Sequence, residues 1–180
     1  MEKNTSPAKS GITYGVLFGA IMILEFVLGY AFKVDPASNP TFGTIMNVLN
    51  FLVLPILFIY ISCNDFKMKL NDGFLTLGNA LKIGVTVCII AAVLYSIFSV
   101  IFNLISPEYM NEMYDKVADM MVEKNPEMTQ EQIEMSISMM KKFANPAIAI
   151  PATIVMYAFI GLIYSLIIGA IIKKEPNQGF

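Results

Sequence analysis

Residues 83–105 have the sequence IGVTVCIIAAVLYSIFSVIFNLI, which contains no charged side chain. A helix of about 20 apolar residues crosses a hydrocarbon core of about 30 Å. The strands of a membrane β-barrel would instead show apolar and polar residues in alternation over segments of about ten residues, and this stretch lacks that pattern. It therefore predicts a transmembrane helix.

Three further stretches have the same character, at residues 12–32, 44–62 and 147–172. Hydrophobic residues make up 56% of the 180-residue chain and charged residues only 14%, against about 25% charge in an average soluble domain. We expect an all-α protein, with residues 1–180 forming one integral membrane domain built as a four-helix bundle. The first stretch is too long for the apolar part of a secretory signal and contains Glu25, so we expect it to be retained.

The distribution of lysine predicts the orientation, because short cytoplasmic segments carry an excess of basic residues. One side of the predicted membrane receives Lys3, Lys9, Lys67, Lys69, Lys82, Lys173 and Lys174. The other side receives five lysines, four of which lie in residues 106–145 together with eight acidic residues. We expect both termini in the cytoplasm and residues 106–145 outside.

Residues 106–145 are expected to form an external insertion of two amphipathic helices, resembling a hairpin, between the third and fourth membrane helices. Thr129-Gln130-Glu131-Gln132 has the form of a capping box and predicts the start of the second helix. Eight of the thirteen methionines lie in this segment. Methionine suits an adaptable apolar face against lipid, the bundle or a partner, whereas Cu(I) capture is the alternative interpretation of the same residues.

Glu25 is the one acidic residue inside a predicted membrane helix. Such groups face the interior of a bundle, because a charge in hydrocarbon is costly. Counting from the helix centres places Asn50 and Tyr157 at a similar depth, with Ser96 or Ser99 nearby. We expect an intramembrane polar cluster of Glu25, Asn50 and Tyr157, which either fixes helix packing or serves as a proton or cation site.

Two membrane stretches carry small residues at four-residue spacing, which lets helices approach closely. They are Gly11, Gly15 and Gly19 in the first and Gly161, Ser165 and Gly169 in the fourth. These residues are expected to serve in helix packing. Pro55 is expected to kink the second helix and free a backbone carbonyl.

The composition argues against catalysis. Histidine, arginine and tryptophan are absent, which removes the commonest general base and the best bidentate anion ligand. No nucleophile–base pair, phosphate loop or metal-ligand spacing is present, so we expect no metal, no cofactor and no nucleic-acid partner. Cys63 and Cys88 lie in or beside apolar runs, and we expect them to be buried and reduced.

Several motifs together resemble a bacterial membrane family catalogued as domain of unknown function 4199. They are GFLTLGNALKIG at 73–84, EQIEM at 131–135, KKF at 141–143 and SLIIGAIIKK at 165–174. The resemblance covers roughly Ser10 to Lys174. It implies a small four-helix membrane protein with a long loop before the last helix, and no activity, cofactor or site residue is carried over from it. We expect a multi-pass protein of the bacterial cytoplasmic (inner) membrane.

The sequence thus leaves two functions open. One is a structural or accessory membrane protein that acts through helix–helix or protein–protein contacts, with the lipid bilayer around it and with itself or another membrane protein as partner. The alternative is a small oligomeric transporter or channel that uses Glu25. A membrane enzyme would lack any recognisable catalytic set.

Overall fold

The computed structural model describes residues 6–34 and 39–175. Its helical elements are α1 (Pro7–Ala31), α2 (Pro40–Val48), η1 (Leu49–Val53), α3 (Leu54–Asp65), η2 (Phe66–Leu70), α4 (Leu77–Ile105), α5 (Pro107–Lys124), α6 (Gln130–Phe143) and α7 (Pro146–Ile172). The described residues contain no strand beyond one isolated bridge. The expected all-α architecture is confirmed for this part of the chain.

Four helical stretches are long and apolar enough to cross a membrane: 7–31, 40–70, 77–105 and 146–172. The expected number of membrane-capable helices is therefore confirmed within the described residues. Their ends differ from the apolar runs, since three helices begin four to six residues earlier and the second continues to residue 70. Prolines begin two of these three helices, α1 and α2, and also α7. A proline is tolerated at the first helical position because the N–H that it lacks would have no hydrogen-bond partner within the helix.

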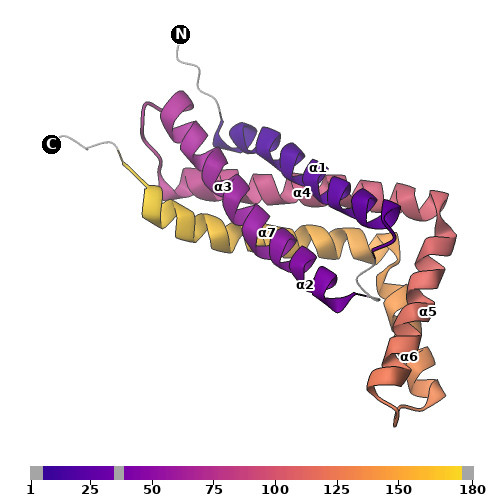
Figure 1. The fold of residues 1–180 in the computed structure, drawn as a ribbon. Helices are drawn as coiled ribbons and strands as arrows, with labels where there is room; N and C mark the ends of the chain where they lie inside the picture. Colours follow the sequence, from indigo (N-terminus) through magenta and orange to yellow (C-terminus); the bar gives the residue numbers. More distant parts are fainter. Residues whose placement is uncertain (1–5, 35–38, 176–180) are drawn as a thin grey trace.

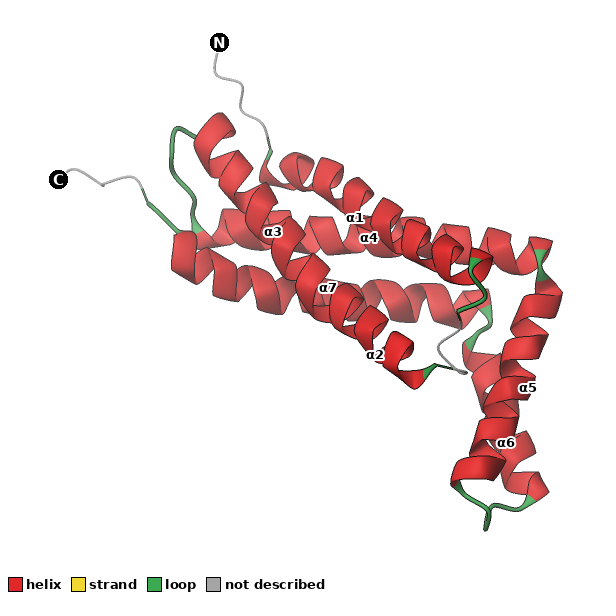
Figure 2. Ribbon diagram, viewed as in Figure 1, coloured by secondary structure: helices red, strands yellow, loops and turns green. Residues whose placement is uncertain are grey.

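Helix α4 is the centre of the bundle (Figure 1). Helix α1 lies along one side of it and α7 along another. The second membrane stretch, α2–η1–α3–η2, crosses over the other three helices at an angle (Figure 2). The four stretches therefore enclose a core between α4 and the crossing helix.

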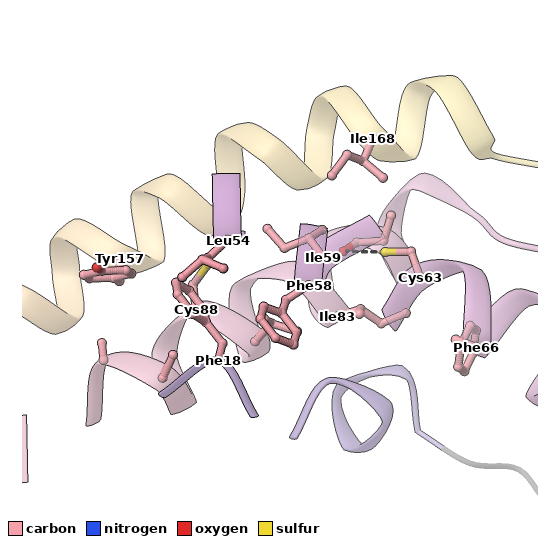
Figure 3. Packing of buried hydrophobic residues seen from close by; sticks show 14 of the residues in the cluster. Phe18, Leu54, Phe58, Ile59, Cys63, Phe66, Ile83, Cys88, Tyr157 and Ile168 are labelled. Carbon is pink, nitrogen blue, oxygen red and sulfur yellow. Dashed lines mark hydrogen bonds between the residues drawn. The ribbon is translucent and has the colours of Figure 1, made fainter. Parts of the chain in front are cut away.

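That core is apolar and closely packed over much of its length (Figure 3). Phe18, Ile59 and Cys88 are fully buried. The rings of Phe18 and Phe58 stack with their centroids 5.6 Å apart. Cys63 and Cys88 are both buried and free, as expected from their surroundings in the sequence.

The first turn of α1 and the last turn of α7 lie at the same end of the bundle, which we call the terminal end (Figure 1). Here the Lys67 ammonium donates a hydrogen bond of 2.9 Å to the Ile172 carbonyl, which places a positive charge at the negative end of α7. The turn between η2 and α4 contains Gly73 at φ +83°, a conformation that glycine adopts without steric cost.

Helices α5 and α6 lie at the opposite end and run crosswise to the long helices (Figures 1 and 2). Thr129 and Gln132 form the predicted capping box at the start of α6. Tyr114 is the one buried residue of the two helices. The α5–α6 pair, residues 107–143, therefore has almost no core of its own.

Candidate functional site

Glu25 and Asn50 are joined by a hydrogen bond across the bundle. The Asn50 amide Nδ2 donates to Glu25 Oε2 at 2.8 Å and to the Met46 carbonyl at 3.0 Å. Because a carbonyl oxygen only accepts, the second bond fixes which end of the amide is the nitrogen. Asn50 Oδ1 is buried and has no hydrogen-bond partner among the described residues.

Tyr157 approaches the same place from α7. Its hydroxyl donates to the Asn50 carbonyl at 3.5 Å, a long bond, and its side chain is buried. The structure thus brings Glu25, Asn50 and Tyr157 together from three different membrane stretches. Of the two serines considered with them, Ser99 lines the adjoining cavity, whereas Ser96 is buried outside its lining.

The backbone around Asn50 is a π-helical turn, η1, and Pro55 lies just beyond it. A proline lacks the N–H that would donate to the carbonyl four residues earlier, which is that of Phe51. The Tyr164 hydroxyl of α7 donates to this carbonyl at 2.9 Å. The freed carbonyl expected from Pro55 is therefore satisfied by a neighbouring helix.

A cavity of about 420 Å³ adjoins the Glu25–Asn50 pair. We call it the Glu25 cavity. Its walls come from the second half of α1, from α2 and η1, and from the second half of α4, with Tyr157 contributed by α7. Residues Tyr109, Met110 and Met113 of α5 complete the lining. Glu25 is the one charged side chain among the described lining residues, and seven lining side chains are aromatic.

The cavity lies toward the α5–α6 end of the bundle. Glu25 is six residues from the middle of α1, or about 9 Å along the axis at 1.5 Å per residue. The apolar run at 12–32 has its middle at residue 22 and predicts a displacement of only three residues. The observed displacement is twice as large because the helix begins at Pro7. Toward the terminal end, the buried rings of Phe18 and Phe58 occupy the core.

A family described as "Protein of unknown function (DUF4199)" matches residues 13–174 of the chain. The chain belongs to this family. The matched segment extends from α1 to the residues just after α7, so it includes every wall of the Glu25 cavity. The comparisons with curated proteins and with solved structures give no match.

The two small-residue stripes of this DUF4199 chain lie against α4. A Cβ added to Gly15 would lie 2.8 Å from the Val87 carbonyl oxygen, and one added to Gly161 would lie 2.8 Å from the Gly84 carbonyl oxygen. An added Cβ would lie 2.7 Å from the nearest atom of α4 at Gly11, 2.8 Å at Gly169 and 3.1 Å at Gly19. The Ser165 side chain is buried. Both stripes are therefore covered within one copy of the chain.

The structure adds cavity residues that the sequence did not single out. Asn47 precedes Asn50 by about one helical turn and Asn103 follows Ser99 by about one turn, and all four line the cavity. Asn47 and Asn103 could have been predicted from the sequence, because each lies about one helical turn from Asn50 or Ser99 on the same helix face. Tyr109 had no such signal, because its place depends on how α5 leaves the bundle.

The DUF4199 chain offers little for a metal ion. Within residues 6–34 and 39–175, no three Cys, Asp or Glu side chains are grouped so that they could hold one. The two buried thiols lie on different helices and are unpaired. What the site offers chemically is one carboxylate with amide, hydroxyl and aromatic groups around it.

Proposed function

We propose that the protein is a non-catalytic, structural or accessory protein of the bacterial cytoplasmic membrane that works through contacts made outside the bilayer by the α5–α6 pair. The proposed orientation has both termini in the cytoplasm. Lysines at the terminal end support it, including Lys67, Lys69 and Lys82, since basic residues favour the cytoplasmic side.

The observation that carries the proposal is the exposed apolar strip of α6. Met135, Met139 and Phe143 follow one another at four-residue spacing and are 59%, 53% and 68% exposed. Four-residue spacing places these side chains on one face of the helix. The pair runs crosswise to the membrane-capable helices, and hence along the membrane surface when those helices stand upright.

An amphipathic helix in this orientation buries its apolar face about 5–10 Å into the boundary between headgroups and acyl chains. We infer that the strip rests on the outer lipid surface and holds the pair beside the bundle. The acidic polar faces of α5 and α6 then remain in water, where they are accessible to other proteins.

A small transporter or channel using Glu25 is the less favoured function. Transport needs polar groups along the whole path, and intramembrane charges mark such paths. Between the Glu25 cavity and the terminal end, the described core is instead filled mainly by apolar side chains such as Phe18, Phe58 and Ile59. Its buried polar side chains there are the serines Ser62 and Ser165, and none of its buried side chains is charged.

The absence of tryptophan from the chain gives a direct test. We expect the single tryptophan of Met139→Trp to be quenched by phospholipids brominated on their acyl chains. Glu134→Trp, on another face of α6, is the matched control and should be quenched by aqueous iodide instead. Equal lipid quenching at both positions, or none at Met139→Trp, would contradict the proposed membrane contact.

The orientation needs a separate test. We expect a reporter enzyme fused after Phe180 to be active only if the enzyme is one that works in the cytoplasm. Activity of an enzyme that works only outside the membrane would overturn the proposed topology.

A further inference from the structure

The charge of the Glu25 cavity indicates what it would hold. Glu25 is its one charged lining residue, and no lysine is among the described lining residues. A carboxylate in a low-dielectric surrounding is stabilised by a positive charge within a few ångströms. Because the described walls supply none, a cationic occupant has the complementary charge.

The hydrogen bonds around Glu25 indicate the chemical form of that cation. Asn50 Nδ2 donates one bond to Glu25, and a carboxylate accepts from several donors. An ammonium group carries three N–H donors and is therefore able to serve the acceptor sites of the carboxylate that Asn50 leaves open.

The lining of the cavity does not suit a bare metal ion. Hard cations need six or more oxygen ligands within about 2.6 Å, whereas Glu25 is the one carboxylate among the described lining residues of this cavity of about 420 Å³. That volume lies in the usual range for small-molecule sites, about 300–1,000 Å³. The occupant is accordingly an organic molecule with a body as well as a charged group.

The rest of the lining suits such a body. Seven aromatic side chains line the cavity, including Phe26, Tyr95 and Tyr109. Aromatic rings attract organic cations through their electron-rich faces and bury apolar surface at the same time. Methionines of α2 and α5, Met46 and Met110, add polarisable apolar walls.

We propose that the Glu25 cavity binds a small organic ammonium compound with an aromatic or aliphatic body. Its ammonium group pairs with the Glu25 carboxylate, and its body lies among the aromatic side chains of the lining. The proposal does not depend on the lipid contact of α6, so each stands or falls by its own measurement.

The test compares 2-phenylethylammonium with 2-phenylethanol, a neutral molecule of nearly the same shape. Binding to the purified full chain is measured calorimetrically in a nonionic maltoside detergent. We expect the ammonium compound to bind at least tenfold more tightly than the alcohol. Glu25→Gln should abolish this preference, whereas Glu112→Gln, which removes an exposed acid outside the cavity, should keep it.

A second measurement uses the wild-type chain and so does not depend on the folding of a variant. An alkylammonium carrying a photoreactive diazirine should label residues of the cavity lining, such as Phe26, Met46 and Met110. An excess of 2-phenylethylammonium should suppress this labelling, and 2-phenylethanol should not. Equal affinity for amine and alcohol, retention of the preference in a folded Glu25→Gln protein, or labelling outside the cavity would each overturn the proposal.

Discussion

Gly84 lies at a close approach of α4 to Ser165 of α7 and Ile59 of α3, so replacing it tests the packing of these three helices. A Cβ at this position would lie 2.5 Å from Ser165 Cβ and 3.1 Å from Ile59 Cγ2. Nonbonded carbon atoms prefer about 3.5–4.0 Å, so Gly84→Ala requires α4 and α7 to separate by about 1 Å. Both contacts involve atoms near the helix backbone, which a change of rotamer relieves poorly.

The expected magnitude combines two opposing effects. Overpacking a closely packed core costs up to about 3 kcal/mol, and alanine is favoured over glycine inside a helix by about 1 kcal/mol. We therefore expect Gly84→Ala to lower the free energy of unfolding by about 2 kcal/mol. The measurement is unfolding in mixed micelles titrated with dodecyl sulfate and followed by circular dichroism.

Gly78, in the first turns of the same helix, provides the control. A Cβ there would meet nothing nearer than Thr76 Oγ1 at 4.0 Å, so Gly78→Ala should leave stability unchanged or raise it by up to about 1 kcal/mol. If Gly84→Ala proved as stable as Gly78→Ala, the close approach of α4 and α7 would be refuted.

Two further outcomes follow from the same core. Tyr164→Phe removes the donor to the Phe51 carbonyl and should lower the free energy of unfolding by about 0.5–1.5 kcal/mol. This loss should be smaller in a Pro55→Ala background, where residue 55 has a backbone N–H for the same carbonyl. Strictly additive effects in the double-mutant cycle would contradict the role given to the Tyr164 hydroxyl. Cys63 and Cys88 are fully buried, so a maleimide should modify neither thiol in the folded protein and both thiols in dodecyl sulfate, as measured by mass spectrometry. Rapid modification of the folded protein would show that the core is accessible to the reagent.

Much of the architecture was predictable because each membrane helix carries its own signal. The apolar runs, the small-residue stripes and the capping box at Thr129 depend on neighbours a few residues away. The meeting of Glu25 with Asn50 followed from depth, since a polar group in hydrocarbon needs a partner at its own level.

What the sequence did not predict depends on contacts between distant segments. The π-helical turn η1 rotates the side chains around Asn50 away from a regular helical register. The crosswise direction of α5 brings Tyr109 into the cavity wall. Neither feature has a local pattern, so neither the volume of the cavity nor the part of its wall formed by α5 could be predicted from the sequence.

The wall formed by α5 connects the Glu25 cavity to the α5–α6 pair. Tyr109, Met110 and Met113 belong to the first two turns of α5, and the α5–α6 pair has little buried surface of its own. A ligand shifts a conformational equilibrium only by its difference in affinity for the two states. An ammonium compound in the cavity would touch these α5 residues, so it favours the state in which they are docked.

We therefore expect 2-phenylethylammonium to slow amide hydrogen exchange in the first turns of α5 more than in α6. The expected change is at least threefold at Met110 and Met113 under saturating ligand, and 2-phenylethanol at the same concentration is the control. Binding of the ammonium compound without any change in α5 would mean that this helix is held in place by the bundle alone, and that the cavity and the α5–α6 pair act independently.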